Sequence, residues 1–204
     1  MTAASPHHAP SSDTRLFMER LFGDEPLDGL IEVRAWPAER ERVVRVFCAN
    51  VTDAEREIGR FARQRLNVFV GVALRRSAGN GTKANLASAR ALWIDVDDLA
   101  DVGAREDFAI RLERFPLPPT LRIWSGGGEH VYWLLQDPVS LAAPDAIVGF
   151  ERRLRGLAAT LGGDPTCCEA ARVLRVPGTA NYPNADKRAK GRVPSLCVAL
   201  RGLR

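Results

Sequence analysis

The sequence lacks the features that mark secreted, membrane-spanning and zinc-stabilised proteins. None of its four cysteines belongs to a Cys-x-x-Cys pair, and two of them are adjacent, which does not fit the usual spacing of zinc ligands. No stretch approaches the roughly 18 consecutive apolar residues of a membrane span. The first residues contain no basic segment followed by an apolar one, so we expect no signal peptide. These absences predict reduced thiols in a cytoplasmic protein with no membrane partner.

Lysine is also scarce, and the basic charge gathers at one end of the chain. Of the 29 basic residues only Lys83, Lys187 and Lys190 are lysines, so arginine supplies almost all of the positive charge. Residues 1–150 have a net charge of −3, whereas residues 151–204, with 11 basic and 4 acidic side chains, have a net charge of +7. Guanidinium groups match phosphate oxygens in geometry and charge. The C-terminal quarter is therefore a hint of nucleotide or nucleic-acid binding.

The length of 204 residues fits one sizeable domain. We expect residues 1–12 to form a disordered lead and residues 13–204 to form a single domain. Apolar spacing predicts helices over about 13–22, 54–66, 104–115 and 144–161, the first two capped by Asp13 and Asp53 and the last opened by Pro144 and ended by Gly162. Alternating residues predict strands at LIEVRAW, RVVRVFCA, NVFVGVALRR, ALWIDVD, TLRIW, EHVYWLLQ and VPSLCVAL, and the segment over residues 164–192 reads as mostly irregular. Strands and helices do not strictly alternate, which favours an α+β fold.

The run ALWIDVDD, residues 91–98, places two carboxylates in an otherwise apolar strand. A period of two puts Asp95 and Asp97 on one face of the strand and turns Asp98 away. Burying paired carboxylates without a counter-charge costs several kcal/mol, so the pair needs a cation or basic neighbours. Mg²⁺ or Mn²⁺ is the usual cation for hard oxygen ligands, often with phosphates completing its shell. The simpler alternative is a strand that ends at Asp95 and continues as a solvated turn.

The second motif is WSGGGEHVYW, residues 124–133. Its three glycines between two predicted strands, Gly126, Gly127 and Gly128, exceed what a hairpin requires. Backbone N–H groups in a tight glycine turn form a concave anion site suited to phosphate. His130 at the mouth of the turn can donate to a triphosphate oxygen. The simpler alternative is a glycine-rich hairpin followed by a half-buried histidine.

The third motif follows the last predicted helix. Asp164 comes directly after two glycines, Arg172 and Arg175 lie three residues apart, and Asn181 follows a Pro-Gly-Thr turn. Two guanidinium groups, a turn and an amide can grip a phosphate and a sugar. Alternatively Asp164 only caps the next turn, which is common for an Asp before Pro.

In this order the motifs resemble those of the archaeo-eukaryotic primase superfamily, and most closely its plasmid and phage branch of RepB-type primases and primase–polymerases. The shared pattern is D-x-D on a strand, S-G-G-G-x-H-x-Y-W on a hairpin, then G-D and R-x-L-R-x-P-G-T-x-N. It covers about residues 67–184, which would be the catalytic core. The resemblance implies an RRM-like mixed or antiparallel sheet packed with helices, an N-terminal α/β unit, and an active site between them.

The resemblance also implies an activity and partners. The family makes or extends primers on a single-stranded DNA template from NTPs or dNTPs, by a two-metal mechanism that uses Mg²⁺ or Mn²⁺. A separate replicative helicase is the partner we expect. The chain ends about twenty residues after PGTANYP, without a helical accessory domain, so nucleotide addition is expected while independent primer initiation is left open.

The roles carried over from the family fall on residues of the three motifs. Asp95, Asp97 and Asp164 would be the metal ligands, and together with His130 they form the predicted catalytic set. The nucleotide and phosphate contacts would come from a second set: Ser125, Gly126, Gly127, Gly128, His130, Arg172, Arg175 and Asn181. Further candidates are Arg75, Arg76 and Lys83 for phosphate and Tyr132 for the ribose.

Two other classes of protein compete with this interpretation. A two-metal nuclease or a nicking replication protein can use a related scaffold, but a rolling-circle nickase needs two histidines around one apolar residue. Outside the predicted lead this chain has only His130. A non-catalytic nucleic-acid-binding module of the same fold is the third interpretation, and the presence of Asp95, Asp97, Asp164 and His130 argues against it.

Overall fold

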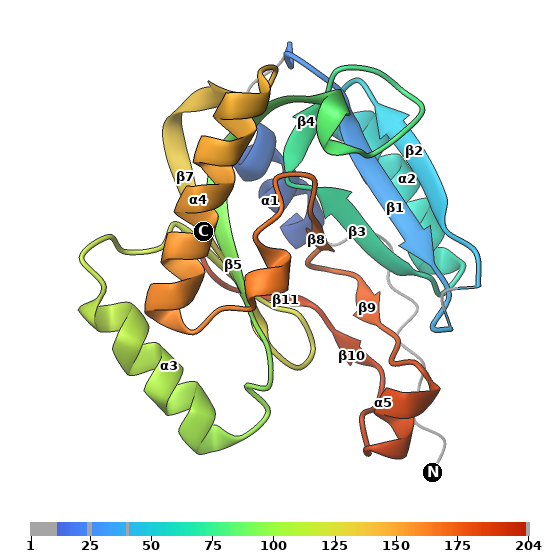
Figure 1. The fold of residues 1–204 in the computed structure, drawn as a ribbon. Helices are drawn as coiled ribbons and strands as arrows, with labels where there is room; N and C mark the ends of the chain where they lie inside the picture. The colour runs from blue at the N-terminus through green and yellow to red at the C-terminus, as the bar shows by residue number, and fades with distance from the viewer. Residues whose placement is uncertain (1–11, 24–25, 40, 203–204) are drawn as a thin grey trace.

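The computed structural model describes residues 12–23, 26–39 and 41–202. The chain forms two antiparallel sheets side by side, with helices packed against them and a small third sheet at the lower edge (Figure 1). The α+β prediction is confirmed. The predicted lead lies outside the described residues except for Ser12, which begins the first helix. Within the described part of the chain, no helix has the length and apolar character needed to cross a bilayer.

The first sheet has the strand order β2–β1–β3–β8, and each neighbouring pair is antiparallel. Its strands are β1 (Ile31–Trp36), β2 (Val44–Cys48), β3 (Asn67–Gly71) and β8 (Val173–Arg175). Helix α2 (Val51–Arg63) packs against β1, β2 and β3. The sequence predicts both early strands, but not β8, because a three-residue strand that pairs with a partner a hundred residues away leaves no local pattern.

The second sheet has the order β11–β6–β7–β5–β4, again with antiparallel neighbours. Its strands are β4 (Ala73–Arg75), β5 (Leu86–Val96), β6 (Leu121–Trp124), β7 (Glu129–Ser140) and β11 (Val198–Arg201). Helix α4 (Pro144–Leu161) packs on β5, and α3 (Val102–Arg114) packs on α4. Helix α1 (Ser12–Phe22) contacts both β5 and α2, so it ties the two halves of the molecule together.

The remaining elements are short. Strands β9 (Ala180–Asn181) and β10 (Ser195–Leu196) form the small third sheet, and α5 (Ala185–Ala189) lies between them in the chain. Two 3₁₀ turns, η1 (Lys83–Asn85) and η2 (Pro165–Cys167), complete the fold.

The single strand predicted at NVFVGVALRR is wrong, because the segment belongs to two sheets. It divides at Val72 into β3 and β4. The break is fixed by a long-range contact, since the Val72 N–H donates to the carbonyl of Arg172 at 3.2 Å. Apolar alternation continues through the break, so the sequence alone does not reveal it.

A buried ion pair joins the sheets at this break. Arg75 of β4 and Glu32 of β1 are both fully buried, and Arg75 Nε donates to Glu32 Oε2 at 2.7 Å. Arg34 and Arg45 pair with the same carboxylate. Burial alone would raise the pKa of Glu32, but the hydrogen bonds and charges of Arg34 and Arg75 outweigh it and lower that pKa. Arg75 therefore has a structural role, and its prediction as a phosphate contact is wrong.

Helix boundaries agree with the sequence except at the first two caps and at the end of α2, which lies at Arg63 and not at the predicted Leu66. Helix α2 begins at Val51, and Asn50 is its N-cap, with Oδ1 accepting from the Asp53 N–H at 2.7 Å. Asp13 likewise lies in the first turn of α1. Asn and Asp cap equally well, so the sequence cannot choose between positions a few residues apart. The end of α4 is confirmed, because Gly162 takes the left-handed conformation with φ +78°.

Candidate active site

The two carboxylates of the first motif lie in a cleft between the sheets. Strand β5 ends at Val96, so Asp95 is inside the strand with 14% of its side chain exposed, while the exposed Asp97 follows it. The cleft has a volume of about 240 Å³ and takes residues from both sheets and from the segment that follows β8. Its lining residues are Trp36, Phe69, Asp95, Asp97, Ser125, Gly127, Gly128, His130, Arg172, Val173, Leu174, Arg175, Asn181, Lys187 and Arg192.

Asp98 does not line this cleft. Its backbone is left-handed, with φ +57°, and its carboxylate accepts from Arg192 Nη2 at 2.9 Å. The predicted division therefore appears in the structure, with Asp95 and Asp97 facing the cleft and Asp98 turned toward its rim.

His130 is placed beside Asp95 by strand pairing. The two residues are partners in the β5–β7 register, and His130 Nε2 lies 3.7 Å from Asp95 Oδ1. Only 4% of the histidine is exposed, and its Nδ1 has no hydrogen-bond partner among the described residues. Burial lowers the pKa of His130, and the charges of Arg172 and Arg175 add to that effect against the opposing charge of Asp95. The imidazole is therefore neutral at neutral pH, with one N–H to donate.

The glycine hairpin is shaped by close packing as well as by its amide groups. A Cβ on Gly128 would clash with the Val96 carbonyl, and one on Gly127 would clash with the Arg192 guanidinium. The Ser125 hydroxyl closes the hairpin by donating to Gly128 O at 3.0 Å, so it is already engaged. Within the described ranges, no protein group accepts from the amide N–H groups of the three glycines. The packing explains why these residues are glycines, and the amides remain available to an anion.

Asp164 is the N-cap of the η2 turn. The sequence allows this capping role as the alternative to metal binding. Its carboxylate accepts from the Thr166 N–H at 2.8 Å and the Thr166 hydroxyl at 2.6 Å. Burial would raise the pKa of Asp164, but these bonds, together with one from Cys167, lower it. Asp164 is not among the cleft-lining residues, although its backbone N–H donates to Asp95 O at 2.7 Å.

Cys167 links the two acidic positions and is a site residue that the sequence does not predict. Its thiol lies 3.3 Å from Asp95 Oδ2 and 3.2 Å from Asp164 Oδ2, and Arg172 Nη2 donates to its sulfur at 2.7 Å. Burial and then the charge of Asp95 raise the pKa of Cys167 far above its ordinary value. The thiol is therefore protonated and serves as a hydrogen-bonding bridge.

The acidic groups fit a divalent ion in part. Partial desolvation and then the charge of Asp95 raise the pKa of Asp97, with Asp164 and Asp98 adding to the repulsion and Lys187 opposing it. A bound cation would relieve that repulsion. Among the described residues, no three side chains of His, Cys, Asp or Glu are arranged to hold an ion together. Mg²⁺ commonly uses one or two carboxylates plus substrate phosphates, so Asp95 and Asp97 fit such an ion, while the Asp164 carboxylate lies on the other side of the Cys167 thiol from Asp95.

The opposite wall of the cleft is aromatic and basic. Trp36 stacks on Phe69 with ring centroids 3.9 Å apart and planes 11° apart, and the Arg175 guanidinium lies over Phe69 at 4.5 Å. These three residues belong to the adjacent strands β1, β3 and β8. Arg175 Nη1 also donates to Asn67 Oδ1 at 2.7 Å, so its position is fixed. The sequence predicts Arg175 at the site but neither aromatic residue.

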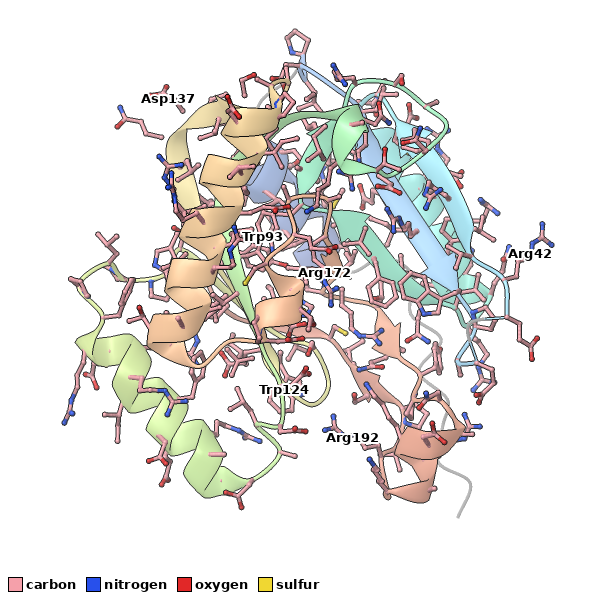
Figure 2. All side chains as sticks on the ribbon, in the orientation of Figure 1. Arg42, Trp93, Trp124, Asp137, Arg172 and Arg192 are labelled. Atoms are coloured by element: carbon pink, nitrogen blue, oxygen red, sulfur yellow. The ribbon has the colours of Figure 1, made fainter. Side chains whose placement is uncertain are left out.

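Cationic side chains also reach the cleft from the segment around α5. Lys187 and Arg192 line it, and neither is predicted by the motifs. Figure 2 shows Arg172 near the middle of the molecule and Arg192 at the lower rim beside α5. Asn181, which is predicted, donates from Nδ2 to the Ser125 carbonyl at 2.7 Å and so holds the hairpin.

The other predicted contacts lie outside the cleft. Lys83 pairs with Glu151 at 2.7 Å, and Arg76 donates to the carbonyl of Ala84. Tyr132 is fully buried and packs edge-to-face on Phe17, so it is not placed beside a ribose in the cleft.

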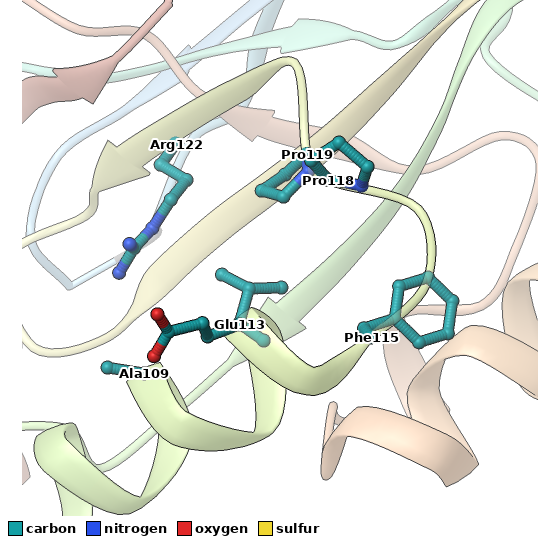
Figure 3. Close-up of a pocket in the computed structure, with 7 residues that line it drawn as sticks. Ala109, Glu113, Phe115, Pro118, Pro119 and Arg122 are labelled. Carbon is teal, nitrogen blue, oxygen red and sulfur yellow. The ribbon is translucent and has the colours of Figure 1, made fainter.

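A second hollow, of about 390 Å³, lies between α3 and the segment leading to β6 (Figure 3). Its charged side chains are Glu113 and Arg122, and the latter already pairs with Glu129 at 2.9 Å. Its lining contains no carboxylate pair, histidine or cysteine, whereas the first cleft brings together Asp95, Asp97 and His130, which makes it the candidate active site.

Comparison with known proteins identifies the family of the chain. The model of the RepB DNA-primase N-terminal domain matches residues 35–201, whereas no curated protein matches. The fold is similar to the archaeo-eukaryotic primase domain of the cyanophage S-2L primase–polymerase, with 19% identity and a TM-score of 0.68 over 96% of this chain and 92% of that one.

Two structures of the primase RepB′ are also similar. The primase itself has 14% identity and a TM-score of 0.58, over 94% of this chain and 57% of that one. Its catalytic domain in complex with initiator DNA has 15% identity and a TM-score of 0.56, over 95% and 87%. At such identities these likenesses show the fold, while the family match extends over most of the chain. The protein therefore belongs to the family of RepB DNA-primase N-terminal domains.

Proposed function

We propose that this protein is a nucleotidyltransferase that makes or extends primers on single-stranded DNA from NTPs or dNTPs. The observation that supports it best is a cleft lined by Asp95 and Asp97 together with the basic residues Arg172, Arg175, Lys187 and Arg192. Such a cleft suits a polyanionic substrate whose phosphate oxygens supply some of the metal ligands. The DNA-bound relative supports DNA as the template.

Asp95 and Asp97 are the residues that would hold two Mg²⁺ or Mn²⁺ ions. When bound, such ions activate the attacking 3′-hydroxyl and stabilise the pyrophosphate leaving group. Asp164 accepts three hydrogen bonds from Thr166 and Cys167, and its Oδ1, which accepts one of them, would have a further lone pair to offer an ion. Cys167 touches both Asp95 and Asp164.

His130 would bind the triphosphate as a neutral donor. No residue in the described part of the chain hydrogen-bonds its buried Nδ1, and a buried hydrogen bond to the substrate would be strong because water is excluded. The guanidinium groups of Arg172 and Arg175 would offset the charge that grows on the leaving phosphates. The Trp36–Phe69–Arg175 stack offers a flat surface of the kind on which nucleic-acid bases stack.

We also propose that residues 13–204 act as one catalytic unit. Trp36 precedes the predicted core over residues 67–184, and Lys187 and Arg192 follow it, yet all three line the cleft. The catalytic unit would therefore extend beyond that core in both directions. A separate helicase remains the partner we expect for template unwinding.

One assay tests the proposal against its alternatives. The protein is incubated with Mg²⁺ or Mn²⁺, a single-stranded template and labelled NTPs or dNTPs, with and without a primer. Asp95→Ala/Asp97→Ala should reduce product growth to background, while the matched control Asp107→Ala/Asp137→Ala, at two exposed aspartates outside the cleft, should not. Template shortening would instead support a nuclease, and binding without turnover a non-catalytic module. Growth that survives the first substitution would overturn the site.

A further inference from the structure

We propose that Arg192 binds the β- and γ-phosphates of the incoming nucleoside triphosphate, and that Asp98 competes with the nucleotide for this guanidinium. The inference rests on the proposed nucleotidyl transfer and adds a phosphate-binding residue that none of the sequence motifs contains. It also gives a function to Asp98, the acidic neighbour of the catalytic pair that is turned away from the cleft.

The position of Arg192 supports the first part. Its guanidinium lies so close to Gly127 that a Cβ there would clash with it, and both residues line the cleft. The amide N–H groups of the glycine hairpin have no protein acceptor in the described ranges. A guanidinium beside free amides is a favourable arrangement for a phosphate group, because the charge and the donors act on the same anion.

The ion pair with Asp98 supports the second part. Arg192 Nη2 lies 2.9 Å from Asp98 Oδ1, with 31% and 89% of the two side chains exposed. An exposed pair of this kind is weak and is screened by salt. A triphosphate carries more negative charge than one carboxylate and can accept both arms of the guanidinium fork. Arg192 can therefore exchange Asp98 for the nucleotide.

The other arginines of the cleft have partners that are more buried than Asp98. Arg172 donates to Cys167, and Arg175 donates to Asn67 and stacks on Phe69. These two are fixed by buried or half-buried neighbours. Within the described ranges, the guanidinium of Arg192 is held by the exposed carboxylate of Asp98 alone, so it is the arginine of the cleft whose partner can change at least cost.

A double-mutant cycle tests the exchange by isothermal titration with a non-hydrolysable dNTP analogue and Mg²⁺. Arg192→Ala should weaken binding about ten-fold, as expected for a charge-assisted bond. Asp98→Asn should tighten it several-fold in the wild type and have almost no effect in the Arg192→Ala background. Tightening of equal size in both backgrounds would show a general charge effect and overturn the competition.

Two further binding measurements test which phosphates Arg192 contacts and whether the effect is specific to this residue. Arg192→Ala should leave the affinity for a nucleoside monophosphate within about two-fold, and equal weakening of both ligands would overturn the assignment to the β- and γ-phosphates. Lys190→Ala removes a charge from the same segment at an exposed residue outside the cleft and should change neither affinity. Inorganic tripolyphosphate should compete for the wild type more strongly than for Arg192→Ala. These experiments measure binding constants and the assay of the proposed function measures primer synthesis. Either result can therefore contradict its own proposal while the other proposal stands.

Discussion

The two walls of the cleft differ in how they are built. The acidic wall comes from β5 and β7, which pair along most of their length, so Asp95 and His130 face each other through strand register alone. The aromatic and basic wall comes from β1, β3 and β8, whose contributions meet only because distant segments fold together. The first wall places charges that repel one another, and the second is a stack of mutually favourable contacts. The residues proposed for catalysis therefore include like charges that oppose one another, whereas the residues of the aromatic wall attract one another.

The largest expected effect separates activity from stability on the acidic wall. Asp97→Asn should reduce primer extension about a thousand-fold, because several kcal/mol of metal-dependent transition-state stabilisation would be lost. The folded-state pKa of Asp97 is raised, so ionising this carboxylate opposes folding. The substitution should therefore leave the melting temperature unchanged or raise it. Primer extension and thermal unfolding are measured together, with Asp107→Asn as the control. If Asp97→Asn were less stable than the wild type, the result would contradict a destabilising repulsion between Asp97 and Asp95.

The next effect concerns the ion pair that joins the walls. Arg75→Met should lower the free energy of unfolding by about 3 kcal/mol, because Glu32 would lose a fully buried partner. Urea denaturation measures the change, and Arg76→Met, at the exposed neighbour, should cost less than about 0.5 kcal/mol. The folded-state pKa of Glu32 is lowered, so its contribution is present above its unfolded pKa and is lost as the pH falls through the folded value. The Arg75→Met deficit should accordingly shrink in acid, and a loss independent of pH would argue against the pair.

A smaller effect should appear as a pH slope. The folded-state pKa of His130 is lowered by burial, so the unfolded chain takes up a proton first as the pH falls below about 6.5. Stability is then lost as the pH falls toward the folded value, with a slope of up to about 1.4 kcal/mol per pH unit. His130→Gln should flatten the curve between pH 5 and 7. Guanidinium unfolding at several pH values provides the test, and an equal slope in the variant would mean that another group titrates.

The difference between the acidic wall and the aromatic wall also explains which site residues could be predicted from the sequence. Asp95 and His130 lie in short motifs on regular strands, where alternation alone decides which side chains share a face, and Asp97 directly follows the end of β5. Trp36 and Phe69 resemble ordinary strand aromatics, and nothing local indicates that they stack. Arg192 gives no signal near itself, although the glycine at position 127 is required by its packing.

Asp164 shows the limit of a motif. Its sequence position matches the family pattern, yet its carboxylate is committed to Thr166 and Cys167. The split between β3 and β4 is a limit of a different kind, because apolar residues continue through a break that only the hydrogen bond from Val72 to Arg172 reveals. For Asp164 the partners are local, two and three residues along the chain, whereas for Val72 the partner is a hundred residues away, and apolar periodicity reports neither.

The smallest expected effect tests whether the aromatic wall acts beyond packing. Phe69→Leu keeps the apolar bulk but removes the ring under Arg175 and Trp36, and should lower the free energy of unfolding by about 1 kcal/mol. Phe115→Leu removes a comparable ring contact, with Trp133 at 5.8 Å, outside the cleft. We expect similar stability losses but several-fold weaker binding of a fluorescent single-stranded oligonucleotide, measured by anisotropy, only for Phe69→Leu. If both variants bind equally well, the stack stabilises the sheet alone, and the basic residues of the cleft must hold the template without it.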